Sequence, residues 1–187
     1  MELIGPYLIA AGLLCSAGVA KAIRPGDTAR AMATLLPGPT SLHLMQRIVR
    51  VGALAEAAVG AAAIVFPRPA TASVVALSYV GFFGVVALAR RRGGPLATCG
   101  CFGRPDTPPT ALHLIVDLAL AAAAAAVALS APRRGTLVTQ LVHQPWGGFP
   151  LLFASAVGLW LTALALSALA ALTASRHLAR PLPQRSS

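Results

Sequence analysis

The fold is decided by the stretch TALHLIVDLALAAAAAAVALSA, residues 110–131, which holds one acidic side chain, Asp117, and no Lys or Arg. A bilayer core of roughly 30 Å is crossed by about 20 apolar residues in an α-helix. This stretch is long enough and apolar enough to make that crossing. It predicts a transmembrane helix.

Four further runs have the same character. They are Leu3–Ile23, Ile48–Phe66, Ala70–Ala89 and Phe149–Ala174. We therefore predict an all-α fold, a polytopic transmembrane helix bundle with a four-helix core over residues 1–131 and a fifth, C-terminal span over 149–174. The N-terminus has no basic segment and no small-residue cleavage site, so the first run is expected to be a retained span and not a signal peptide.

The connections between the spans differ in length. The first predicted helix ends near Pro25-Gly26-Asp27-Thr28, a segment that contains a proline, a glycine and residues typical of a helix N-cap. This pattern predicts a short helix at the membrane interface over residues 28–36. Pro67 and Pro69 predict a tight link between the second and third spans. The Arg- and Pro-rich segment 175–187 is expected to be a disordered tail.

The composition excludes a water-soluble domain. Hydrophobic residues make up 57% of the chain and charged residues 11%, whereas a soluble domain carries about 25% charged residues. The net charge of +10 comes from Lys and Arg at the ends of the apolar runs, where they anchor helices and contact anionic lipid head groups. The expected partner is the lipid bilayer, and no nucleic-acid motif is present.

The distribution of basic residues predicts the orientation. Twelve fall on one side of the predicted spans and three, Arg68, Arg133 and Arg134, on the other. Since cytoplasmic segments carry an excess of Lys and Arg, we expect a multi-pass protein of the plasma membrane with its N-terminus outside and its C-terminus in the cytoplasm.

The most informative motif is Thr98-Cys99-Gly100-Cys101-Phe102-Gly103, between the third and fourth spans. Two thiols separated by one glycine form a strained disulfide, which is easily reduced. Neighbouring Arg residues favour the thiolate, the nucleophile in exchange. Cys99 and Cys101 are therefore candidates for a redox pair. Two alternatives stay open: unreactive loop cysteines, or a metal site that His113 or His43 would have to complete, although two thiolates fall short of one and no metal is predicted.

Ionisable residues inside the predicted spans are the second set of candidates, because such residues are costly in a membrane unless paired. Glu56 lies in the second span and Lys21 near the inner end of the first. Glu56 is expected either to act in function or to form a structural ion pair with Lys21 or Arg50. Asp117 follows His113 by one helical turn, so the two share a face and could transfer protons, bind a quinone carbonyl or simply join helices.

Cys15, in the first span, is expected to be a packing residue, with the role of a resolving thiol as the alternative. The sequence shows no nucleophile–His–acid arrangement, no paired-carboxylate motif and no phosphate-binding loop. A thiol–disulfide relay is therefore a better description than a conventional enzyme.

These residues together resemble the methylamine utilisation protein MauE family, within the DoxX-like group of small helical membrane proteins. The likeness covers roughly Leu3–Ala131. It rests on Ser16-Ala17-Gly18-Val19-Ala20-Lys21, the Pro-containing linker, Glu56 followed by Gly60, and Cys99-Gly100-Cys101-Phe102-Gly103.

The resemblance implies a membrane component of methylamine metabolism. MauE proteins are needed for production of methylamine dehydrogenase, whose small subunit is rich in disulfides, and they are thought to assist disulfide formation or transport. The expected partners are a thioredoxin-like protein or a dehydrogenase subunit. The one cofactor considered is a quinone, which His113 and Asp117 suggest.

The orientation and the implied function conflict. Disulfides of an exported enzyme form outside the cytoplasm, whereas the count of basic residues places the cysteine segment inside. Three explanations stay open: a relay from cytoplasmic reductants, a segment that folds back into the membrane, or the opposite orientation. Two other functions also remain, an oligomeric transporter or permease subunit with a polar path along Lys21, Glu56, His113 and Asp117, and an assembly scaffold without chemistry.

Overall fold

The computed structural model describes residues 4–35, 41–91, 111–130, 137–142 and 145–178. The helices are α1 (Ile4–Ile23), α2 (Pro25–Leu35), α3 (Leu42–Val65), α4 (Pro69–Arg91), α5 (Ala111–Leu129), α6 (Leu137–Val142) and α7 (Phe149–Leu178), with a 3₁₀ turn, η2 (Pro145–Gly148), before the last. Five of the described helices are long and apolar enough to cross a membrane. The all-α bundle with five spans is confirmed.

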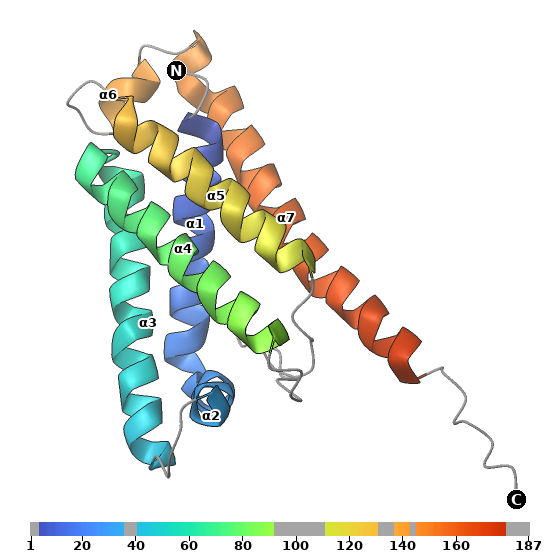
Figure 1. The fold of residues 1–187 in the computed structure, drawn as a ribbon. Coiled ribbons are helices and arrows are strands. Elements are labelled where there is room, and N and C mark those ends of the chain that lie inside the picture. Colours follow the sequence, from blue (N-terminus) through green and yellow to red (C-terminus); the bar gives the residue numbers. More distant parts are fainter. Residues whose placement is uncertain (1–3, 36–40, 92–110, 131–136, 143–144, 179–187) are drawn as a thin grey trace, which may run out of the picture.

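The long helices surround α1 (Figure 1). Helix α1 packs most extensively against α3, and it also contacts α5, α7 and, more briefly, α4. Helix α4 packs along α5, whereas α3 and α4 share few contacts beyond their connection. The chain starts at one end of the bundle and α7 finishes at the other, as an odd number of spans requires.

The short helix that we predicted at residues 28–36 is α2, and it starts earlier than predicted. Pro25 is the first residue of α2 and not part of a break before it. Proline is tolerated in the first helical turn, where its missing N–H would have no intrahelical acceptor, and Asp27 in the same turn complements the helix dipole. Ala29 is fully buried while Arg30 is exposed, so α2 is amphipathic, and its contacts are mainly with α3.

Helices α3, α4 and α7 are longer than the predicted spans. Helix α3 begins at Leu42 and not at Ile48, because Leu42–Arg47 contains only residues compatible with a helix. Only Phe66, Pro67 and Arg68 separate α3 from α4, which confirms the tight link. Helices α6 and η2 were not predicted. Helix α7 continues through Leu178 and so enters the segment expected to be disordered; residues 179–187 lie outside the described part.

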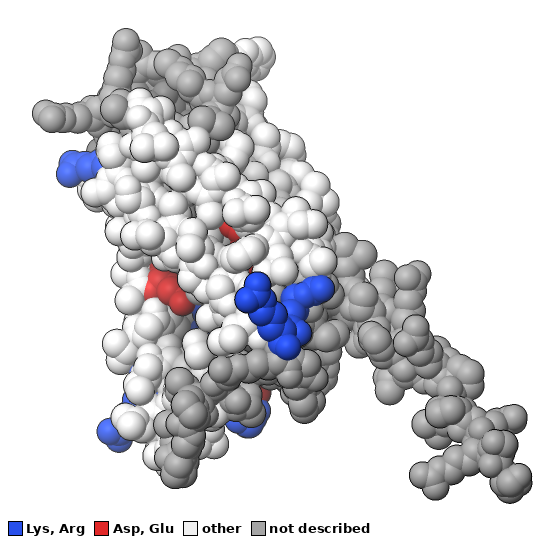
Figure 2. Space-filling view, viewed as in Figure 1, with Lys and Arg blue, Asp and Glu red and all other residues white. Residues whose placement is uncertain are grey.

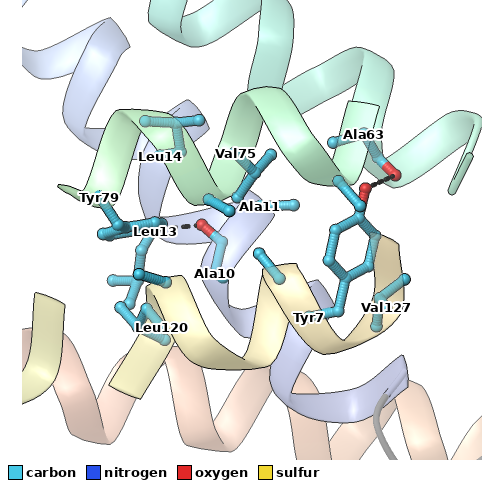
Figure 3. Close-up of a cluster of buried hydrophobic side chains, with 14 residues drawn as sticks. Tyr7, Ala10, Ala11, Leu13, Leu14, Ala63, Val75, Tyr79, Leu120 and Val127 are labelled. Carbon is cyan, nitrogen blue, oxygen red and sulfur yellow. Dashed lines mark hydrogen bonds between the residues drawn. The ribbon is translucent and has the colours of Figure 1, made fainter. Parts of the chain in front are cut away.

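Two tyrosines tie α1 to its neighbours inside the core (Figure 3). The Tyr79 hydroxyl of α4 donates to the carbonyl oxygen of Ala10 at 2.7 Å, and the Tyr7 hydroxyl of α1 donates to the carbonyl oxygen of Ala63 at 3.3 Å. Both rings are buried. A helix carbonyl has a second lone pair for such a bond, so each hydroxyl is satisfied without breaking a helix.

Glycine sets the distance between α1 and α3. A Cβ on Gly60 would lie 2.5 Å from the backbone nitrogen of Cys15, and one on Gly18 would lie 2.5 Å from the backbone nitrogen of Ala57. The two helices thus meet backbone to backbone, the arrangement that small residues allow in membranes. Cys15 contributes its backbone to this contact, and its thiol is free and half-buried.

The basic residues of the described helices collect at one end of the bundle. Lys21 lies in the last turn of α1 and Arg24 directly follows that helix, Arg47 and Arg50 lie in the first half of α3, and Arg90 and Arg91 close α4. Arg68 lies at the opposite end, in the link between α3 and α4. Most of the visible basic surface in Figure 2 accordingly covers the lower half of the molecule. The helix topology is therefore consistent with the predicted asymmetry.

The close α1–α3 contact can be tested with two matched substitutions. Gly60→Ala should lower the free energy of unfolding by about 1–3 kcal/mol, because the new methyl group meets backbone atoms that cannot rotate away. Gly52→Ala, on the same helix with no atom within 4 Å of the added Cβ, should be neutral or stabilising. Thermal unfolding of purified protein in detergent measures both; equal stability of the two variants would contradict the backbone contact.

Candidate functional site

An ion pair between α1 and α3 is the first element of the site. The Lys21 ammonium contacts a carboxylate oxygen of Glu56. Lys21 is 7% exposed, so its charge is almost entirely removed from the surroundings. Of the two partners considered for Glu56, Lys21 and Arg50, the structure thus selects Lys21. The Gly18 and Gly60 contacts bring α3 close enough to α1 for the two side chains to meet.

The Lys21 ammonium also lies over an aromatic ring. Its nitrogen is 4.7 Å from the centroid of the Phe82 ring on α4, within the range of a cation–π interaction. The Phe82 ring in turn packs edge-on against Tyr79 at 5.8 Å between centroids. Lys21 therefore links three helices, α1 and α3 through the ion pair and α4 through the ring.

A cavity of about 40 Å³ lies beside Lys21. Four helices form it: α1, α4, α5 and α7. Its polar or ionisable lining residues are Lys21, Tyr79, His113 and Asp117, and the rest of the lining is apolar, for example Leu14, Val86 and Leu166. Most of the ionisable residues singled out inside the spans therefore share one cavity, and Glu56 joins them through its ion pair with Lys21.

His113 and Asp117 occupy the first two turns of α5. His113 is buried and Asp117 is half-buried, and both face the cavity as their spacing of one turn predicted. The cavity thus lies toward the end of the bundle at which α4 ends and α5 begins. The segment with Cys99 and Cys101 is joined to this end.

The cysteine pair itself lies outside the described residues, as does every other residue from 92 to 110. His43, the alternative ligand for a metal, is exposed near the start of α3. Among the described residues no three His, Cys, Asp or Glu side chains are grouped so that they could hold a metal ion.

Sequence reasoning missed the two aromatic residues of the site. Tyr79 and Phe82 belong to an apolar run in which Phe82 carries no distinguishing signal. Tyr79 did carry a recognisable signal, because a hydroxyl group in the middle of a transmembrane span must find a hydrogen-bond acceptor. Their partners, Ala10 and Lys21, are far away in the sequence and follow only from the packing.

Removal of one partner tests the ion pair. Glu56→Gln should lower the free energy of unfolding by about 3–5 kcal/mol, because it leaves the Lys21 ammonium buried without a counter-charge. Asp27→Asn breaks the pair between Asp27 and the 63%-exposed side chain of Arg30, and should change stability by about 0–1 kcal/mol. Chemical unfolding in mixed micelles measures the difference; a similar small loss in both variants would count against a buried pair.

Comparison with known proteins assigns the chain to a family. The family model described as Methylamine utilisation protein MauE matches residues 2–130, which span α1 to α5 and the intervening segment with Cys99 and Cys101. No curated protein and no solved structure gives a significant match. The matched region contains Lys21, Glu56, His113 and Asp117, and it excludes α7. Because the match covers more than half of the chain, the protein belongs to the methylamine utilisation protein MauE family.

Proposed function

We propose that the protein is an integral membrane thiol–disulfide exchange protein that supports maturation of a disulfide-containing partner. The observation that carries the proposal is the cavity that gathers Lys21, His113 and Asp117. Ionisable residues at membrane depth mark functional sites by default. Methylamine dehydrogenase or a thioredoxin-like protein is the proposed partner, in keeping with the family.

The covalent connection favours cooperation between the cavity and the thiols. Cys101 precedes the first residue of α5, Ala111, by ten positions, and Cys99 follows the last residue of α4, Arg91, by eight. Ten extended residues span at most about 33–36 Å, so both sulfurs are tethered to the helix ends that form the cavity. Arg90 and Arg91 close α4, and positive charge near a thiol favours the thiolate.

One round of exchange involves only the pair and its partner, and an oxidant of the disulfide class must re-form the Cys99–Cys101 disulfide before the next round. A thiolate of the partner attacks one sulfur of the Cys99–Cys101 disulfide, and the other sulfur leaves as a thiolate, which gives a mixed disulfide. The second partner thiolate attacks that mixed disulfide, so the partner leaves oxidised and Cys99 and Cys101 leave as a dithiol. Two electrons and two protons move from the partner to the pair. His113 and Asp117 are proposed to transfer these protons.

A quinone does not fit the described cavity. A cavity of about 150 Å³ binds benzene, whereas the one beside Lys21 measures about 40 Å³. No step is therefore assigned to a quinone.

We further propose that the protein lies in the plasma membrane with its N-terminus outside and its C-terminus in the cytoplasm, on the basis of the basic residues at the α2 end of the bundle. With this orientation the direct partner of the cysteine pair is a cytoplasmic thioredoxin-like protein, whereas direct oxidation of an exported dehydrogenase requires the opposite orientation.

Thiol trapping in native membranes tests the exchange function. After acid quenching, a mass-tagged maleimide should show two populations, one with Cys99 and Cys101 reduced and one with both oxidised. Cys99→Ser and Cys101→Ser should each remove the oxidised population and abolish complementation of a deletion strain. Cys15→Ser is the matched control. It should retain the oxidised population and should still complement the deletion strain, because Cys15 packs in the bundle.

The outcomes distinguish the competing functions. Thiols that stay reduced under all conditions, together with full complementation by the Cys99→Ser/Cys101→Ser variant, would leave a scaffold or a transporter subunit. Labelling with a membrane-impermeant maleimide from each side in turn locates the thiols. Reaction only from the cytoplasmic side agrees with the proposed orientation, and reaction only from the outside reverses it.

A further inference from the structure

The cavity beside Lys21 has the size and lining of a site for water. A water molecule needs about 10–15 Å³ and two to four polar partners, and about 40 Å³ is available. The Lys21 ammonium has three donors, and Glu56 occupies one side of it. The Tyr79 hydroxyl donates to Ala10, and its ring is part of the lining. Asp117 adds two oxygens on the α5 side.

The balance of charge around the cavity leaves one carboxyl group over. Lys21 is paired with Glu56. The ion pair of Asp27 with Arg30 lies at the α2 end, and Asp117 takes part in neither of these two pairs. A carboxylate in a largely apolar site is disfavoured relative to its protonated form unless an opposite charge is paired with it. The groups that line the cavity with Asp117 are Lys21 on α1, Tyr79 on α4 and His113 on α5, and the charge of Arg90 on α4 acts on His113.

We propose that the cavity holds a small cluster of water molecules and that Asp117 binds an exchangeable proton there, with Lys21 as the second contact of the cluster. The ligand of this site is thus water and a proton. The Lys21–Glu56 pair has a defined part in it, because it keeps Lys21 from serving as the counter-ion of Asp117. The site stands on the cavity and on the Lys21–Glu56 pair, whether or not thiol exchange takes place. If the proposed exchange does take place, Asp117 supplies an exchangeable proton at the end of the bundle to which the thiols are joined.

Cysteine accessibility tests for the water. In a background with Cys15, Cys99 and Cys101 replaced by Ser, Asp117→Cys should be oxidised by hydrogen peroxide, whose size is close to that of water, and should then escape maleimide labelling of the unfolded protein. Leu118→Cys, whose position on the same helix faces outward and is 58% exposed in the bundle, should stay reduced over the same time, because lipid covers it and disfavours the thiolate. Val116→Cys also lines the cavity and replaces Asp117→Cys if that variant does not accumulate.

Infrared difference spectroscopy tests for the proton. At near-neutral pH the wild-type protein should show a carboxylic-acid C=O band that shifts in D₂O, is lost in Asp117→Asn and persists in Asp27→Asn. Absence of the band, or its persistence in Asp117→Asn, would overturn the assignment of the proton to Asp117. A cavity cysteine as unreactive as Leu118→Cys, or equal reaction of both, would overturn the water site. Since all three native cysteines are absent from the labelling background, failure here is independent of failure of the thiol exchange.

Discussion

The backbone contact between α1 and α3 is the constraint on which the rest of the bundle depends. Gly18 and Gly60 remove the two side chains that would hold these helices apart. Lys21 and Glu56 then meet without either reaching the lipid as an isolated charge. In a membrane, where lipid chains compete with apolar side chains on equal terms, close packing and polar contacts decide which helices associate. Both kinds of contact occur at the α1–α3 interface.

Contacts of α1 also determine where α4 and α5 lie. The Lys21 ammonium lies over Phe82, and Tyr79 bonds to the backbone of α1, so α4 is positioned by the same helix that carries the ion pair. Helix α5 packs along α4 and brings His113 and Asp117 to the cavity. The ionisable residues that a bilayer tolerates poorly are thus gathered in the interior, at the end of the bundle to which Cys99 and Cys101 are joined.

Much of this arrangement could be predicted from the sequence because lipid imposes simple requirements. Runs of about 20 apolar residues predicted all five spans, and the i, i+4 spacing of His113 and Asp117 predicted a shared face. The sequence also offered Lys21 as one of two partners for Glu56, since buried charges need partners. The choice of Lys21 over Arg50 required the close α1–α3 contact at Gly18 and Gly60. That contact joins two segments that are far apart in the sequence.

The errors have local physical causes. Pro25 was read as a break, although proline suits the first turn of a helix as well as a turn. The start of α3 was placed too late because the search followed hydrophobicity, whereas Leu42–Arg47 is helical beyond the most apolar segment. Phe82 could not be found, because nothing in an apolar run marks the one ring that faces a cation.

A double-mutant cycle on the ion pair is the most direct measurement of the central claim. Lys21→Met, Glu56→Met and the double variant would be compared with the wild type by unfolding in detergent. Each single variant should lose about 3–5 kcal/mol, whereas the double variant should recover most of that loss, because replacing both charges leaves none unpaired. Losses that simply add in the double variant would show that the two side chains act separately and would contradict the account.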